Sequence, residues 1–232
     1  MKSNDLGRVI GIQYENKNEP TYMKSHEIQP LPLARFYFHE DGKIVERTTR
    51  ELFYDKRVAI FGLPGAFTPT CTESLVPDYE ELYDELIASG VDDVYCISVN
   101  DTYVMNAWRE FLGVKKVKFI PDGNGFFTRQ LSLNVFKTNV GFGVRSWRYS
   151  GIVNNDMFEI MLCEKGQCDN CTEDPYVESR PEKLLAYLKE TDKESSFTTS
   201  DVFEEMSEEM SEEMETLESI EQKLYVDKNR LT

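Results

Sequence analysis

The chain has 232 residues, 40% of them hydrophobic, which is enough for one good-sized folded domain with additional segments. Its 42 acidic and 26 basic residues give a formal charge of −16, which argues against nucleic acid or an anionic membrane as partner, because both require clustered Lys and Arg. No apolar stretch approaches the roughly 20 residues of a membrane helix, and the first residues lack the apolar segment of a secretory signal. A soluble, cytoplasmic protein is expected.

The N-terminal part is expected to pass from a loosely ordered lead-in, residues 1–30, to regular structure. Residues 33–39 and 43–48 flank Asp41-Gly42, a dipeptide typical of a tight hairpin turn. The apolar run 58–63 then predicts a buried strand.

A Pro/Gly-rich octapeptide, PGAFTPTC over residues 64–71, joins this strand to an amphipathic helix that we expect to end at Gly90. Cys71 falls in the first turn of that helix, where unpaired backbone N–H groups and the helix dipole favour the thiolate. The spacing of Thr70 and Glu73 is that of a capping box, which would fix the helix start. Position alone leaves open the interpretation of Cys71 as a small buried core residue.

The next segments alternate between strands and helices. We expect a buried strand over 92–99, a helix over 102–112 closed by Gly113, a strand over 117–120, a hairpin formed by 146–153 and 157–163, and a closing helix over 181–189. Cys96 lies within a continuous apolar run and is interpreted as a core residue. This order predicts an α/β fold with helices on both faces of one sheet.

The last segment, residues 191–232, differs in composition from the rest. It carries 13 acidic and 4 basic residues and repeats the tetrapeptide Glu-Glu-Met-Ser. A solvated acidic tail is one interpretation, because like charges four residues apart weaken an isolated helix. An amphipathic helix for docking or self-association is the other, because apolar residues recur at steps of three and four.

Several motifs resemble the peroxiredoxins. The pattern Pro-x-x-x-Thr-x-x-Cys in the octapeptide is similar to the active-site signature of that family, and PGAFTPTC is similar to the peroxiredoxin-5 subfamily in particular. The stretches SVNDTYVMNAW (98–108), FIPDGNG (119–125) and RSWRYS (145–150) are similar to bacterial members, some of which carry a fused glutaredoxin domain. The resemblance covers about residues 30–190. It implies a thioredoxin-like domain over 31–190 that begins with the β-hairpin.

The resemblance implies a thiol peroxidase that uses no metal, haem or flavin. Cys71 would be the peroxidatic cysteine, which attacks a hydroperoxide and becomes a sulfenic acid. Thr68 and the backbone N–H of Cys71 would contact the peroxide, and Pro64 would shield the sulfenate from water. Arg148 would stabilise the thiolate and orient the peroxide, although an isolated arginine would be interpreted as a surface residue. Arg145 lies an odd number of residues away and is expected to face the opposite side of the same strand.

A second group of cysteines follows the predicted hairpin. By the resemblance, Cys171 is the candidate resolving cysteine, which would form an intrachain disulfide with Cys71, and Cys168 is the alternative. The Cys168-x-x-Cys171 spacing also fits half of a zinc site, an interpretation that needs two further ligands. Only Cys163, His26 and His39 are available for that role, so no metal is expected.

The resemblance also implies partners. A hydroperoxide would be the substrate, and the oxidised cysteine would be recycled by glutathione with glutaredoxin, or by thioredoxin, as separate proteins, because no glutaredoxin domain is recognised in this sequence. A homodimer is expected. The alternative function is a redox-controlled interaction or sensor protein, in which oxidation of Cys71 is the signal and the acidic tail helix binds the partner.

Overall fold

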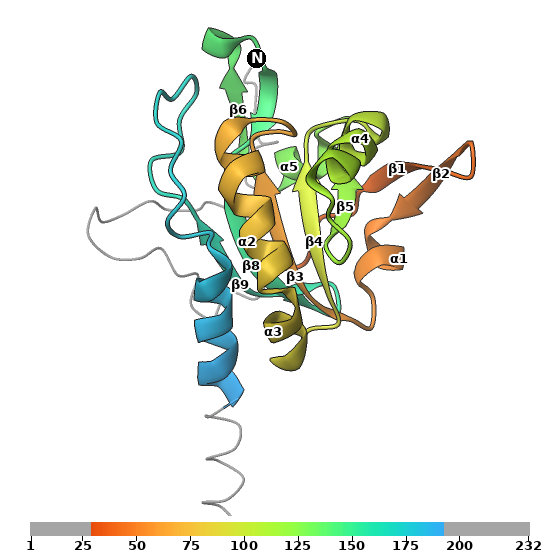
Figure 1. The fold of residues 1–232 in the computed structure, drawn as a ribbon, viewed down its shortest axis with the longest axis vertical. Coiled ribbons are helices and arrows are strands. Elements are labelled where there is room, and N and C mark those ends of the chain that lie inside the picture. Colours follow the sequence, from red (N-terminus) through yellow and green to blue (C-terminus); the bar gives the residue numbers. More distant parts are fainter. Residues whose placement is uncertain (1–28, 193–232) are drawn as a thin grey trace, which may run out of the picture.

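The computed structural model describes residues 29–192, which form a five-stranded mixed sheet with helices against both faces (Figure 1). Residues 1–28 and 193–232 lie outside the described part of the chain. The predicted lead-in, residues 1–30, therefore lies outside the described part except for its last two residues, where Gln29 O accepts a hydrogen bond from Phe158 N and Pro30 forms a β-bridge with Met157. The interpretations of the tail, and the domain boundaries at 30 and 190, stay predictions.

The central sheet is built around the strand that precedes the octapeptide. In spatial order its strands are β5 (Lys118–Pro121), β4 (Asp93–Ser98), β3 (Arg57–Leu63), β8 (Tyr149–Asn154) and β9 (Met157–Cys163). Strand β3 pairs in parallel with β4 and antiparallel with β8. Phe61 and Leu63 enter one hydrophobic core, while Val58 and Ile60 enter the other, so β3 is buried on both faces.

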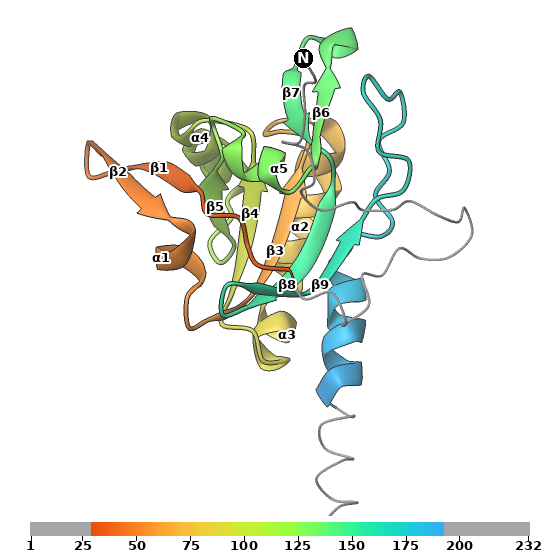
Figure 2. The ribbon, with the colours of Figure 1, turned by 180° about the vertical axis from the view of Figure 1, so that it is seen from behind.

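Each face of the sheet is covered by a different set of helices (Figures 1 and 2). Apolar residues of α2 (Val76–Glu81), α3 (Tyr83–Ala88), α4 (Thr102–Leu112) and the helical residues 181–192 pack into one core. Those of α1 (Thr49–Phe53) and α5 (Phe126–Gln130) pack into the other. The α/β fold with helices on both faces is therefore confirmed.

Two hairpins extend from this body. Strands β1 (Arg35–Glu40) and β2 (Lys43–Thr48) pair antiparallel, as predicted, and Asp41 and Gly42 turn with φ of 48° and 74°. Strands β6 (Asn134–Lys137) and β7 (Gly143–Ser146) form the second hairpin around a short 3₁₀ helix, Thr138–Val140. The predicted helix over 102–112 is confirmed, with Asp101 capping its start and Gly113 its end.

The prediction of one continuous helix after Cys71 is wrong. A π-helical turn, η1 (Cys71–Leu75), comes first, and α2 and α3 are separated at Leu82. Pro77 explains the widened turn, because it has no N–H to donate to the carbonyl of the preceding turn and its ring crowds that carbonyl. The predicted capping box is also wrong, since Thr70 is itself helical and its side chain makes no capping hydrogen bond.

The strand predicted over 146–153 is likewise divided. Strand β7 ends at Ser146 and pairs with β6, whereas β8 begins at Tyr149 and pairs with β3 and β9. Between them Trp147 N donates to Leu133 O, at 2.6 Å, which turns the chain from one sheet to the other. The prediction that Arg145 faces the opposite side of the strand that carries Arg148 was therefore wrong, because no single strand contains both.

Replacing Gly62 with Ala is expected to lower the free energy of unfolding by about 1–3 kcal/mol. The added Cβ would overlap the buried Tyr149 ring, which lies opposite Gly62 in the register of β3 and β8, so the strands would have to separate. Urea unfolding measures the change. Gly42→Asn is the control, because nothing surrounds a Cβ at Gly42 and Asn tolerates its φ of 74°. Equal losses in the two variants would contradict this explanation.

Candidate active site

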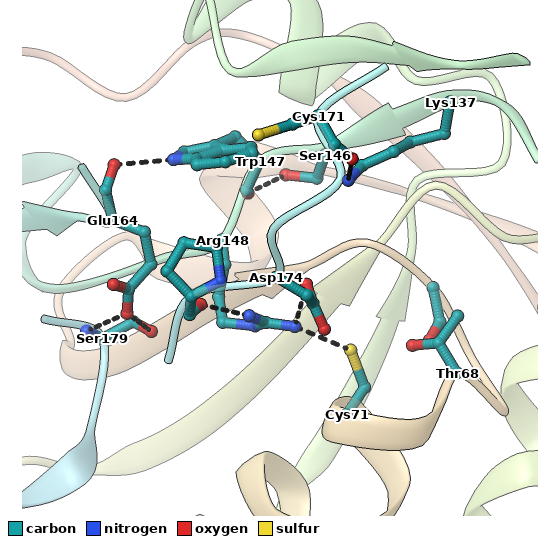
Figure 3. A network of polar contacts seen from close by, with 12 residues as sticks. Thr68, Cys71, Lys137, Ser146, Trp147, Arg148, Glu164, Cys171, Asp174 and Ser179 are labelled. Carbon is teal, nitrogen blue, oxygen red and sulfur yellow. Dashed lines mark hydrogen bonds and ion pairs between the residues drawn. The ribbon is translucent and has the colours of Figure 1, made fainter. Parts of the chain in front are cut away.

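Cys71 and Arg148, which are 77 residues apart in sequence, meet at one end of the central sheet. Cys71 begins η1 and its side chain is fully buried. Arg148 lies between β7 and β8, is 1% exposed, and places Nη2 3.6 Å from Cys71 Sγ (Figure 3). A buried guanidinium therefore contacts the sulfur directly.

The loop that follows β9 holds the other side of the guanidinium. Asp174 Oδ1 accepts from Arg148 Nη2 at 2.8 Å, the Pro175 carbonyl accepts from Nη1, and the Tyr176 ring centre lies 5.9 Å from the guanidinium carbon. Burial by itself would lower the pKa of Arg148, but the nearby Cys71 and the Asp174 carboxylate outweigh burial and raise it. The arginine is therefore held as a cation between two acidic groups.

Glu164 connects this loop to the segment that carries Arg148. Its side chain is buried, and Oε1 accepts from Val177 N at 2.8 Å, Ser179 N at 2.9 Å and Ser179 Oγ at 2.7 Å. Its backbone N–H donates to Arg148 O at 3.0 Å, and its carbonyl accepts from Trp147 Nε1 at 2.7 Å. One residue thus fixes both the start of β8 and the loop opposite it.

The octapeptide loop curls beside Cys71. Pro64 is buried at the end of β3. Thr68 lies next to Cys71 (Figure 3), and its hydroxyl donates to Gly65 O at 2.9 Å. Thr68 O accepts from Thr72 N at 3.0 Å, which joins the loop to η1. The Thr68 hydroxyl, which was predicted to contact the peroxide, is therefore hydrogen-bonded to the backbone carbonyl of Gly65 in the same loop.

Asn100 supports the loop from the end of β4. Its Oδ1 accepts from Ala66 N at 2.9 Å, Ser98 Oγ at 2.8 Å and Arg145 Nη1 at 3.3 Å. Arg145 is close enough that a Cβ added to Gly65 would lie 2.7 Å from its Nη1. Arg145 therefore braces the octapeptide, whereas Arg148 contacts the sulfur.

Cys96 is buried in one hydrophobic core, and Cys163 is partly buried against the other. Burial raises the pKa of Cys96 well above its ordinary value, and the nearby Cys71 raises it further. Burial also raises the pKa of Cys163 to about 12, with a smaller contribution from the Glu164 charge. Cys96 belongs to the same hydrophobic core as Cys71, as expected from its apolar strand.

Cys168 and Cys171 lie apart from this site. In Figure 3 the Cys171 sulfur lies beside the Trp147 indole, and Arg148 and Asp174 lie between it and Cys71. Cys168 is exposed, Cys171 is partly buried, and both are free thiols. The structure thus does not bring Cys171, the predicted resolving residue, to Cys71.

Asp174, Glu164 and Asn100 were not found from the sequence. Asp174 reaches Arg148 across 26 positions, and Asn100 reaches Ala66 across 34, so no local spacing indicates either contact. Within residues 29–192, no three His, Cys, Asp or Glu side chains are grouped to hold a metal ion. No helix in that range is long and apolar enough to cross a membrane.

Known proteins similar to this chain cover most of the part that the structure describes. The family described as Redoxin matches residues 30–161. Peroxiredoxin y4vD of Sinorhizobium fredii is 52% identical over 146 residues, which cover 63% of this chain and 78% of that protein. The hybrid peroxiredoxin hyPrx5 of Haemophilus influenzae is 45% identical over 166 residues, which cover 72% of this chain and 67% of that protein.

Solved structures agree with this relationship. The 1-Cys peroxiredoxin of Plasmodium falciparum superposes with a TM-score of 0.67 and 36% identity, over 70% of this chain and 98% of that one. Reduced Prx3 of Vibrio vulnificus in complex with H₂O₂ gives a TM-score of 0.63 and 36% identity, over 69% and 96%. Both likenesses extend over nearly the whole of the solved chain.

Glu164→Ala is expected to lower the free energy of unfolding by about 3 kcal/mol, because three donors of residues 177–179 would lose their buried acceptor. Glu164→Gln is the matched control, since its amide keeps one oxygen of the same shape, and a loss of about 1 kcal/mol is expected. Urea unfolding compares the two. Identical midpoints for Ala and Gln would show that Glu164 does not hold the loop.

Proposed function

The chain belongs to the peroxiredoxin family and is a thiol peroxidase, and we propose that Cys71 is the residue that reduces hydrogen peroxide and alkyl hydroperoxides. The observation that carries this proposal is the buried Arg148 guanidinium, whose Nη2 lies 3.6 Å from Cys71 Sγ. A thiolate, not a thiol, attacks a peroxide, and an adjacent cation in a site of low dielectric favours the thiolate.

The reaction needs only groups of this site and the peroxide. Cys71 Sγ, as a thiolate, attacks the terminal oxygen of the hydroperoxide, and the S–O bond forms as the O–O bond breaks. The alkoxide or hydroxide leaves and takes up one proton, which balances the proton that the Cys71 thiol lost on ionising. The product is Cys71 sulfenic acid with one alcohol or water. Arg148 is placed to orient the peroxide and to stabilise the developing negative charge with its planar set of N–H donors.

The octapeptide supplies the remaining groups. The Thr68 hydroxyl rotates about its Cα–Cβ bond, so it can exchange the Gly65 carbonyl for a peroxide oxygen. The buried ring of Pro64 limits the access of water to the sulfenic acid. The H₂O₂ complex of the Vibrio vulnificus relative supports a peroxide as the ligand of this site.

The sulfenic acid would then be reduced by a thiol from outside the chain. The separation of Cys171 from Cys71 in Figure 3 and the 1-Cys peroxiredoxin of Plasmodium falciparum among the similar structures both support a one-cysteine cycle. Glutathione with glutaredoxin, or thioredoxin, would be the reductant. The protein itself would be a cytoplasmic homodimer. Peroxide turnover with glutathione and glutaredoxin is compared with turnover with thioredoxin and no glutathione, which distinguishes the two reductants. Thioredoxin-dependent turnover without glutathione would contradict the glutathione route.

Arg148→Met is expected to slow the reaction of the reduced protein with hydrogen peroxide by about 10²–10³-fold, because a preorganised donor beside the reacting atoms is lost. Stopped-flow tryptophan fluorescence measures the second-order rate constant.

Arg145→Met is the matched control, because Arg145 contacts Asn100 and no interaction joins it to Cys71 in the described part of the chain. Its rate constant should fall less than tenfold. A larger loss than in Arg148→Met would show that the wrong arginine was assigned. Cys71→Ser sets the baseline, and turnover retained in that variant would overturn the assignment of Cys71.

A further inference from the structure

The sequence Cys168-Asp169-Asn170-Cys171 folds as a turn that the neighbouring hairpin holds in place. The two central residues form the turn, and Asn170 has a φ of 53°. Phe136 N donates to Asp169 Oδ1 at 2.8 Å, and Asn170 N donates to Phe136 O at 2.6 Å. The turn is thus bonded to the end of β6 on both sides of its centre.

The Asn170 side chain adds a second set of bonds. Its Oδ1 accepts from Thr138 Oγ1 at 2.8 Å and from Asn139 N at 3.0 Å, while Asn139 Nδ2 donates to Asn170 O at 3.1 Å. Asn is one of the few residues that adopt a positive φ readily. Residue type and bonding therefore agree in fixing the turn.

A turn of this kind brings its first and fourth residues together. The Cα atoms of those positions lie within about 7 Å, and a disulfide spans Cα separations of about 4.4–6.8 Å. The Cys171 side chain is a hydrogen-bonding neighbour of Cys168, and that contact raises the pKa of Cys168, whereas the Lys137 ammonium opposes the rise. Lys137 is itself buried, and its Nζ donates to Cys171 O at 3.2 Å.

Exposure suits the two thiols to different steps. Cys168 is exposed, so a molecule from solvent can reach its sulfur. Cys171 is partly buried, packs against the core that contains Trp147, and lies away from Cys71 (Figure 3). Cys168 is therefore the entry thiol and Cys171 the thiol that completes the exchange.

We propose that Cys168 and Cys171 form a second redox-active centre, a dithiol that exchanges with small disulfides of the glutathione class and closes into a disulfide within the turn. Lys137, buried beside the pair, carries a positive charge that partly offsets the rise in the pKa of Cys168 caused by its hydrogen bond with Cys171, and so assists formation of the attacking thiolate. Cys71 takes no part in this exchange, so the centre is separate from the peroxidase site.

The exchange balances in two steps. The Cys168 thiolate attacks one sulfur of RSSR, the Cys168–S–S–R bond forms as the RS–SR bond breaks, and RS⁻ leaves. The Cys171 thiolate then attacks the Cys168 sulfur, which forms the Cys168–Cys171 bond and releases the second RS⁻. The protein loses two electrons and two thiol protons, and the small disulfide is reduced to two thiols.

The full chain carrying Cys71→Ser tests this directly, because any peroxidase chemistry is removed. Reduced protein is incubated with glutathione disulfide, alkylated, digested with trypsin and analysed by mass spectrometry. The tryptic peptide 166–183 contains Cys168 and Cys171 and no other cysteine. We expect it to lose two hydrogens and to resist alkylation. Glutathione retained on Cys168, a cross-link to another cysteine, or two alkylated thiols would each overturn the proposal.

Asn170 provides the matched pair of variants. Asn170→Ala loses the side-chain hydrogen bonds and disfavours the positive φ. The equilibrium constant for forming the Cys168–Cys171 disulfide, measured in a glutathione redox buffer, should therefore fall about tenfold. Asn170→Gly loses the same bonds but tolerates that φ, and a smaller fall is expected. An unchanged constant in Asn170→Ala would show that the turn does not bring the two thiols together.

Discussion

The buried positive charge of Arg148 is the constraint around which the rest of the site is arranged. Removing a guanidinium from water costs several kcal/mol unless other charges and hydrogen bonds compensate. Here the Asp174 carboxylate, the Pro175 carbonyl and the Cys71 sulfur surround it. Ionising Cys71 adds an anion to this group of contacts, so the arginine and the thiolate stabilise each other.

The sheet register explains why residues so far apart in sequence meet. Gly62 pairs with Tyr149, so the residue before β8 lies beside the end of β3, where the octapeptide begins. The absence of a side chain at Gly62 gives the Tyr149 ring its space. The same antiparallel pairing that closes the core therefore carries Arg148 to the start of η1.

Local patterns predicted much of this structure, and the exceptions have physical causes. Asp101 and Gly113 mark both ends of α4, and Asp41-Gly42 marks the first hairpin, because capping and turn signals lie next to the elements they define. The octapeptide likewise pointed to Cys71 from residues adjacent to it.

The remaining features depend on contacts across the chain. The break between β7 and β8 depends on a hydrogen bond from Trp147 to Leu133, which no periodicity reveals. The same is true of Asp174 and Glu164, whose partners are distant in sequence. The π-helical turn at Cys71 reflects Pro77, whose effect on the preceding turn was missed although the residue is visible in the sequence.

A double-mutant cycle on Arg148 and Asp174 tests the central claim most directly. The rate constant for reaction with hydrogen peroxide is measured in Asp174→Asn, Arg148→Met and the double variant. If Asp174 acts only by holding the guanidinium against Cys71, the double variant should react no more slowly than Arg148→Met alone. Losses that multiply, as for independent residues, would contradict the account.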